Sequence, residues 1–168
     1  MIRQIVESGM TFEVDEDFLY HIEESALVKK TKYFKTPEFA FLTGKDVVVI
    51  VEAKTSVPRP ESKEDFKSYL EEIRDKFMNA MALLNACWSK RNLAELGEMP
   101  GSMQKVTIVE ANYKLYLVVA SAQEEWLVNV NNAFKSELQI LFRTWNVQDT
   151  AFKVITKAKA IQLGLVKY

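Results

Sequence analysis

The stretch PEFAFLTGKDVVVIVEAK, residues 37–54, decides the fold that this sequence predicts. An apolar segment at 38–42 is followed by the turn residues Thr43-Gly44-Lys45 and by a second apolar segment at 47–53. The run of β-branched residues at 47–51 is typical of a strand that is buried on both faces of a sheet. We therefore expect 38–42 and 47–53 to form adjacent antiparallel strands, with the second strand central in the sheet.

Charged residues stand at the end of this expected central strand. Glu52 and Lys54 are two residues apart, so a strand directs both side chains to the same face. The turn folds Glu38 back alongside them. Two carboxylates and an ammonium group would then meet beside a buried strand. Such a set can hold a hard divalent cation through oxygen ligands and activate a water molecule beside it.

The composition restricts the class of protein. A chain of 168 residues can bury a proper core, and we expect one domain, 1–168. The net charge of −1 gives no overall basic field that would indicate nucleic acid or a membrane. Cys87 is the only cysteine, which excludes an internal disulfide and fits a cytoplasmic location. No apolar run approaches the roughly 20 residues that span a bilayer, so no membrane partner is expected.

Two other chemistries are excluded by the residue counts. One histidine, His21, and one cysteine cannot form a four-ligand zinc site. The five glycines are scattered and form no phosphate-binding loop.

The rest of the chain alternates between helical and extended patterns. In chain order we expect a hairpin at 2–14 with a turn at Ser8-Gly9, a helix that starts at 15–17 and reaches about Leu27, the two strands above, a long helix at 62–96, a short strand at 106–109, a strand at 114–122, a helix at 124–145, a strand at 152–156 and a short helix at 157–164. This order predicts an α/β protein, with a central mixed sheet of four to six strands flanked by helices.

Glu38 and the motif Glu52-Ala53-Lys54 resemble the signature of the PD-(D/E)xK nuclease superfamily, an acid followed by a strand that ends in acid-x-Lys. Pro37-Glu38 stands where that family has Pro-Asp. The element order of the family core, helix, three strands, helix, strand, is similar to the order expected here. The resemblance implies a restriction-endonuclease-like fold. It also implies a nuclease that hydrolyses phosphodiester bonds with a metal-activated water.

The same resemblance implies a role for each site residue. Glu38 and Glu52 would ligate Mg²⁺ or Mn²⁺, with the Ala53 carbonyl as a third ligand. Lys54 would orient or help deprotonate the attacking water and stabilise charge at the phosphorus. A carboxylate on the first helix is often part of such sites, and Glu23 or Glu24 could fill that place. The implied partner is a nucleic acid, DNA more readily than RNA, and a homodimer stays open.

Other interpretations of these residues remain open. Acid-x-Lys also occurs at 61–63 and 65–67, where a helix is expected to start, so the motif alone is weak. Glu38 replaces the commoner Asp, and no Gln-x-x-x-Tyr-type motif follows in the long helix. The alternative function is a catalytically inactive domain of this fold that acts as an interaction or regulatory module. The basic residues of 29–35 form either a solvated turn or a surface for phosphate groups.

Overall fold

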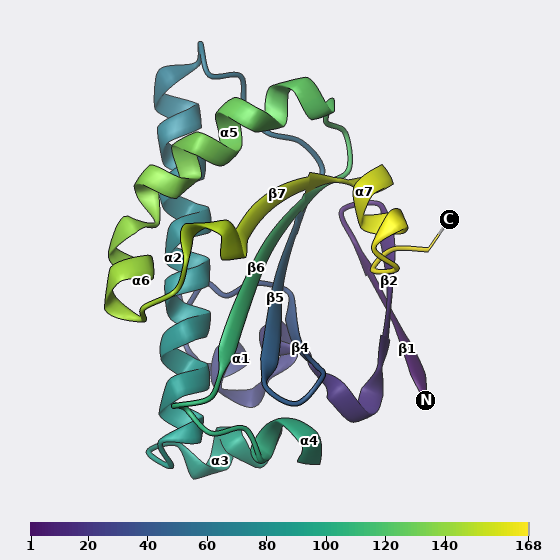
Figure 1. Ribbon diagram of the computed structural model, residues 1–168, viewed down its shortest axis with the longest axis vertical. Coiled ribbons are helices and arrows are strands. Elements are labelled where there is room, and N and C mark those ends of the chain that lie inside the picture. The colour runs from purple at the N-terminus through teal and green to yellow at the C-terminus, as the bar shows by residue number, and fades with distance from the viewer. Residues whose placement is uncertain (168) are drawn as a thin grey trace.

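The computed structural model describes residues 1–167 and has a mixed five-stranded sheet at its centre, flanked by helices (Figure 1). The strands lie in the order β3 (Leu19–Tyr20), β4 (Phe39–Thr43), β5 (Val47–Lys54), β6 (Asn112–Val119) and β7 (Phe152–Thr156). Neighbours are antiparallel from β3 to β5 and parallel from β5 to β7. The prediction of adjacent antiparallel strands with the second one central is therefore confirmed.

One face of the sheet is covered by helices. The long helix α2 (Lys63–Trp88) runs along this face, and α5 (Glu124–Glu137) and α6 (Gln139–Thr144) pack beside it (Figure 1). The rings of Phe77 and Phe134 contact Phe152 of β7, with centroid separations of 5.8 and 5.2 Å. Aromatic packing of this kind fixes α2 and α5 against the sheet.

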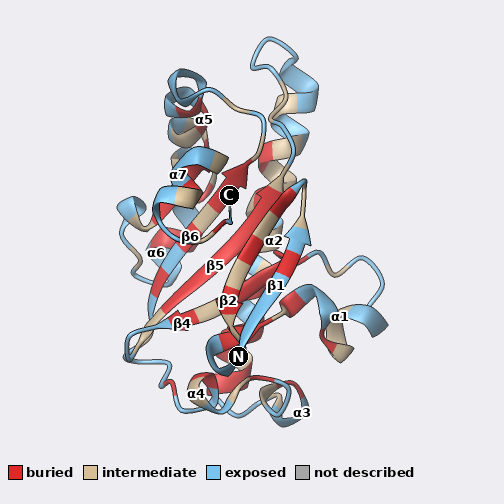
Figure 2. Cartoon of the chain, turned by 90° about the vertical axis from the view of Figure 1, so that its right-hand side faces the viewer, coloured by how far each residue is buried: buried red, intermediate tan, exposed pale blue. Residues whose placement is uncertain are grey.

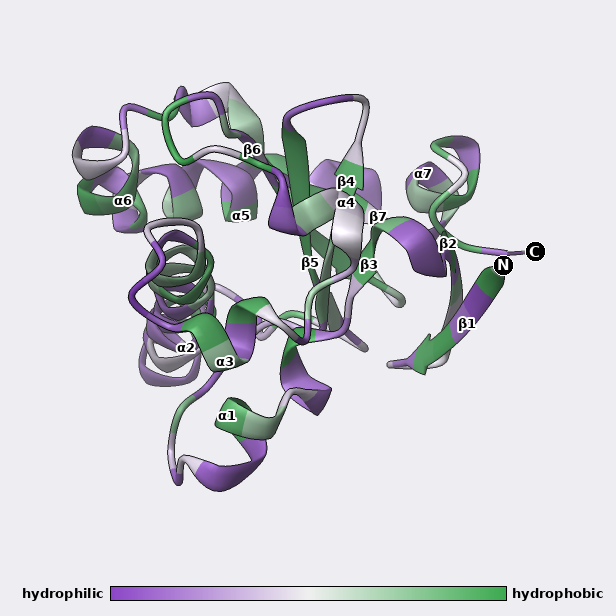
Figure 3. Cartoon of the chain, turned by 90° about the horizontal axis from the view of Figure 1, so that it is seen from below, coloured by the Kyte–Doolittle hydropathy of each residue, from purple (hydrophilic) through white to green (hydrophobic). Residues whose placement is uncertain are grey.

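The opposite face is covered by a separate hairpin and a short helix. The hairpin consists of β1 (Ile2–Glu7) and β2 (Met10–Asp15), and the helix is α7 (Lys157–Gln162). Figure 3 shows the mostly hydrophobic strands between α2 on one side and the hairpin on the other. Phe12 of β2 packs edge-on against Phe39 of β4, with centroids 5.3 Å apart. Burial is greatest in β5, which lies between the two layers (Figure 2).

The outer edge of β2 is covered by the last described residues of the chain. Val166 bridges Phe12, and the N–H of Lys167 donates to the carbonyl of Thr11 at 2.8 Å. The hairpin turn is at Ser8-Gly9, as predicted, and both residues have positive φ, 50° and 73°. Both ends of the chain lie beside the hairpin at different places, because the carbonyl of Met1 accepts from the N–H of Glu16 just after β2.

The expected helix from 15–17 to Leu27 is wrong. The segment consists of a 3₁₀ turn (Glu16–Phe18), strand β3, a second 3₁₀ turn (Ile22–Glu24) and the short helix α1 (Ala26–Lys30). Long-range pairing prevails over the helical pattern, because Leu19 pairs with Phe41 at the edge of the sheet.

Smaller differences occur further along the chain. Residues 106–109 do not form the expected strand; 106 and 107 are irregular and a turn covers 108–110. The helix expected at 62–96 ends at Trp88, Lys90 has a φ of 60°, and α3 (Leu93–Leu96) and α4 (Gly101–Gln104) follow. The helix expected at 124–145 breaks at Leu138 into α5 and α6, and a 3₁₀ turn (Asp149–Ala151) precedes β7. No helix within residues 1–167 combines the length with the apolar character that a membrane span requires.

Candidate active site

Side chains of β5 point alternately to the two faces of the sheet, and those of Glu52 and Lys54 point toward α2. Val51 and Ala53 belong to the hydrophobic core between the sheet and the hairpin, and Ile50 belongs to the core between the sheet and the helices. Glu52 and Lys54 continue the face of Ile50, as a period of two requires. The side chain of Glu52 is fully buried, with 0% exposed.

Glu38 lies opposite Glu52 at the start of β4. Phe39 pairs with Val51, so the antiparallel register places Glu38 and Glu52 one step further out on the two strands. Both side chains are on the side of α2, and the charge of Glu52 contributes to the raised pKa of Glu38, after burial and the hydrogen bond with Glu23. The structure therefore brings together Glu38, Glu52 and Lys54, the three residues predicted for catalysis.

Two lysines surround the carboxylate of Glu52. Lys76 of α2 has its Nζ 2.7 Å from Oε1 of Glu52, and Lys54 has its Nζ 3.4 Å from the same oxygen. Lys54 in turn donates to Oε1 of Glu72 at 2.9 Å. Glu72 and Lys76 are one helical turn apart and face the same strand end. The result is a line of alternating charges between β5 and α2.

The surroundings keep Lys54 in its charged form. Burial lowers the pKa of Lys54, but the hydrogen bond to Glu72 and the charge of Glu52 outweigh burial and raise the pKa above its usual value. An ammonium group with a raised pKa does not accept a proton from water at neutral pH. Lys54 can therefore act as a fixed positive charge, but not as a general base.

Glu38 is an acid with a strongly raised pKa. Its side chain is buried, with 6% of the residue exposed. Burial is the largest cause that raises the pKa of Glu38 to about 9, followed by the hydrogen bond with Glu23 and the charge of Glu52. Burial also raises the pKa of Glu52, and Lys76 and Lys54 oppose this effect. Glu38 is thus protonated at neutral pH unless a cation replaces the proton.

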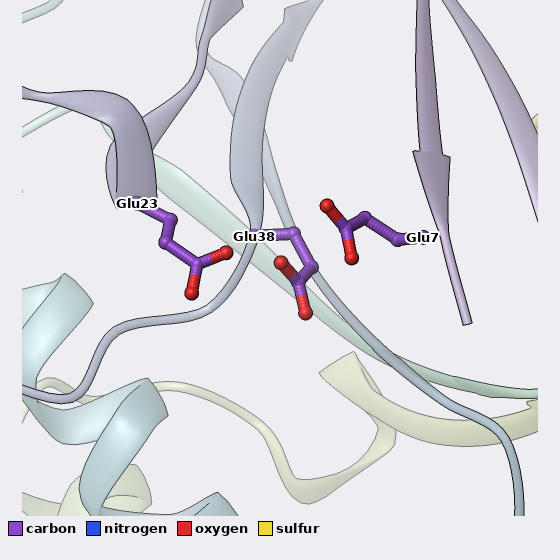
Figure 4. Close-up of side chains that lie close together, drawn as sticks. All are labelled: Glu7, Glu23 and Glu38. Carbon is purple, nitrogen blue, oxygen red and sulfur yellow. The ribbon is translucent and has the colours of Figure 1, made fainter.

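Glu23 and Glu24 have different partners. One carboxylate oxygen each of Glu7, Glu23 and Glu38 lies within 4.8 Å of the others. Glu38 lies between the other two in Figure 4. Glu24 forms an ion pair with Lys29 instead. Of the two acids that the sequence offered, Glu23 is therefore the one beside Glu38.

The carbonyl of Ala53 points toward the same region. The neighbouring carbonyl of Lys54 accepts a hydrogen bond from Ala120 on the β6 side. Alternate carbonyls of a strand point in opposite directions, so that of Ala53 points toward β4 and Glu38. It accepts a hydrogen bond from Oγ of Ser8, at 3.1 Å, and retains a second lone pair.

The donor atoms fit a hard divalent cation. Oε2 of Glu38 and Oε2 of Glu52 are both buried, and neither has a hydrogen-bond partner among the described residues. A buried carboxylate oxygen without a donor is costly, so such atoms mark a missing partner. Mg²⁺ and Mn²⁺ prefer carboxylate and carbonyl oxygens as ligands. Glu38, Glu23 and the Ala53 carbonyl offer oxygen donors of this kind, whereas Glu52 lies outside the group of acids, Glu7, Glu23 and Glu38, whose oxygens are within 4.8 Å of one another.

Several residues of the site are absent from the sequence-based prediction. Glu7 comes from the hairpin, and no pattern in the sequence indicates which end of the sheet the hairpin reaches. Tyr69, Glu72 and Lys76 come from α2, at a spacing of three and four that shares one helix face. That spacing, beside the inward residue Ile73, is the one signal that could have identified them. The motifs at 61–63 and 65–67 lie at the exposed start of α2.

Comparisons with protein-family models, curated proteins and solved structures gave no match to this chain. The resemblance to the PD-(D/E)xK superfamily therefore stays a prediction that rests on the motif and on the arrangement of its residues.

Proposed function

We propose that this protein is a divalent-metal-dependent nuclease with a restriction-endonuclease-like core. The observation that carries the proposal is the pairing of Glu38 with Glu52 across β4 and β5, with Lys54 on the same face. Two buried carboxylates, each with an oxygen that lacks a hydrogen-bond donor, would destabilise the fold if they served only as structural ion pairs. In metal-assisted phosphodiester hydrolysis the carboxylates would be metal ligands, and Lys54 would stabilise negative charge on the phosphate.

Four groups would hold Mg²⁺ or Mn²⁺ at this site: the carboxylates of Glu38, Glu52 and Glu23, and the carbonyl of Ala53. A bound ion of this type supplies a Lewis acid and lowers the pKa of water. Lys76 fixes Oε1 of Glu52 and leaves Oε2 free. The helix thereby orients the ligand without occupying both of its oxygens.

Lys54 is the cation beside the reacting groups in this proposal. Glu72 holds its Nζ in place, so little reorganisation is needed when charge develops on a phosphate oxygen. The exposed residue Lys35 lies close enough to lower the pKa of Glu72 by its charge. Asn79 of α2 donates to the carbonyl of Lys35 at 2.7 Å and fixes its backbone. These contacts support a phosphate-bearing substrate.

The surroundings also offer a place for a nucleobase. A pocket of ≈ 480 Å³ lies beside the loop that follows Lys54, and Arg59 and Trp126 contribute to its lining. The side chain of Trp126 is largely exposed, which leaves its ring available for stacking. DNA is the first substrate to test, and a homodimer would be compatible with the same chemistry.

One observation favours the alternative, an inactive domain of this fold that serves as an interaction or regulatory module. Lys76 gives Glu52 a counter-ion from the protein itself, 2.7 Å away. A site that had lost its metal would need such a compensating charge.

The deciding experiment is a cleavage assay on single-stranded DNA, duplex DNA and RNA with Mg²⁺ or Mn²⁺. We expect metal-dependent cleavage by the wild type and a loss of about 10²–10³ in rate for Lys54→Ala. Lys63→Ala, taken from the chance motif at 61–63, is the matched control and should cleave like the wild type. Equal cleavage by wild type and Lys54→Ala would assign the activity to a contaminant. Absence of cleavage on every substrate would favour the inactive module.

A further inference from the structure

The N-terminal hairpin brings an additional carboxylate to the site. We propose that Glu7, Glu23 and Glu38 form a divalent-cation site that joins the hairpin to the central sheet, so that cation binding locks the hairpin in place. The proposal adds Glu7 and a conformational consequence to the site above, and its catalytic meaning rests on the proposed function because Glu38 belongs to both.

Hydrogen bonds that do not involve the three carboxyl groups help to hold the segments that carry these acids in place. The N–H of Glu23 donates to the carbonyl of Glu38 at 3.3 Å. Oγ of Ser8, the residue after Glu7, donates to the carbonyl of Ala53 at 3.1 Å. Three separate elements therefore present their carboxyl groups to one point, and contacts outside the carboxyl groups help to hold these elements in place.

The separation of the oxygens suits a cation. They lie within 4.8 Å of one another. Oxygens on opposite sides of a Ca²⁺ ion are about 4.6–5.2 Å apart, twice the usual ligand distance, and those of smaller ions are somewhat closer. The three acids can thus surround a cation with small side-chain adjustments.

The three acids have no directly paired cationic side chain in the described part of the chain. Among residues 1–167, no lysine, arginine or histidine forms an ion pair with Glu7, Glu23 or Glu38. The neighbouring acids Glu24 and Glu52 each have a lysine partner. A divalent cation could take the place of the proton on Glu38 and balance the three carboxylates.

The second and independent observation is the state of Glu38. Its side chain is buried and lies between the two other acids in Figure 4. Its Oε2 has no hydrogen-bond donor among the described residues. A ligand atom that is buried, unpartnered and placed between two further ligands is typical of a cation site, and less so of a solvated acidic patch.

The test uses Mn²⁺ as the probe and the full-length chain. Mn²⁺ binding is measured by electron paramagnetic resonance, and amide hydrogen exchange is measured in the hairpin, residues 2–15. We expect Mn²⁺ to slow exchange in the wild-type hairpin. We expect Glu7→Gln to lose about tenfold or more in Mn²⁺ affinity and to lose the slowing. Glu16→Gln changes an exposed acid at the opposite end of the hairpin; it is the matched control and should behave like the wild type.

A thermal melt without metal shows whether Glu7→Gln is folded, and Glu7→Asp gives a second variant that should retain part of the affinity. Unchanged Mn²⁺ affinity and unchanged hairpin exchange in Glu7→Gln would overturn the inference even if the wild type cleaves DNA. Loss of Mn²⁺ in Glu7→Gln together with an inactive wild type would support the cation site and reject the nuclease. The two proposals therefore fail in distinguishable ways.

Discussion

Lys76 Nζ lies 2.7 Å from Oε1 of Glu52, so a fully buried strand carboxylate meets a helix ammonium group whose side chain is only 11% exposed. This contact ties α2 to the end of β5 at the position where the catalytic residues are predicted. It makes Glu52 a structural residue as well as a candidate ligand. Separate substitutions of Lys76 and Lys54, the two lysines beside Glu52, are therefore needed to distinguish effects on stability from effects on activity.

The first prediction concerns this ion pair. Glu52→Gln leaves Lys76 buried without a counter-ion, and we expect a loss of about 3 kcal/mol in the free energy of unfolding. Adding Lys76→Met should recover part of the loss, with a coupling of about 0.5–3 kcal/mol in urea unfolding. The exposed pair Lys67–Glu71 at 3.8 Å is the control, with an expected coupling of about 0–1 kcal/mol. Additive effects at Glu52 and Lys76 would contradict the prediction.

The second prediction concerns pH. The pKa of Glu38 is about 9 in the folded protein, against 4.5 for an ordinary glutamate. Between these values the folded state binds more protons than the unfolded state, so stability falls as pH rises, by at most about 1.4 kcal/mol per pH unit. Urea unfolding in EDTA at pH 5, 7 and 8.5 should show this decrease. Glu38→Gln should flatten it and Glu16→Gln should not; parallel curves for wild type and Glu38→Gln would disprove the assignment.

The third prediction concerns Glu72, which holds Lys54 through a hydrogen bond of 2.9 Å. Glu72→Ala should lower the cleavage rate less than Lys54→Ala does, because the ammonium group remains but is no longer oriented. Glu71→Ala removes a neighbouring acid that pairs only with the exposed Lys67, and should have no effect on cleavage. Rates from single-turnover assays decide the comparison. An effect of Glu72→Ala as large as that of Lys54→Ala would indicate a more direct role for Glu72.

The fourth prediction concerns Tyr69 of α2. Its hydroxyl is buried without a hydrogen-bond partner, and burial followed by the charge of Glu52 raises its pKa. Tyr69→Phe should therefore leave stability unchanged or raise it by about 1 kcal/mol. Tyr113→Phe is the control, because that hydroxyl donates to Oδ1 of Asn85 at 3.0 Å and should cost about 1 kcal/mol. A clear loss in Tyr69→Phe would show that the hydroxyl has a partner in solution.

The sequence predicted the centre of the sheet well because its signals are local. A run of β-branched residues specifies a buried strand, and a period of two places Glu52 and Lys54 on one face. The turn at Gly44, which has a φ of 67°, then sets the register that brings Glu38 opposite Glu52. These features need no knowledge of the rest of the chain.

The parts that were missed depend on contacts between distant segments. The acids at 15–17 are typical of a helix start, yet Leu19 and Tyr20 gain more by pairing with β4. Glu7 and Lys76 reach the site only because the hairpin and α2 pack on opposite faces of the sheet near the end of β5. Periodicity within one element indicates which way a side chain points, but not which other element it meets.

The cover on the outer edge of β2 has a consequence for synthesis on the ribosome. The hairpin is made well before its edge partners, Val166 and Lys167. Until they emerge, β2 has a free edge that can pair with another nascent chain. The hairpin with Glu7 therefore gains this edge support only after β4 and β5 have been made and can bring Glu38 and Glu52 together.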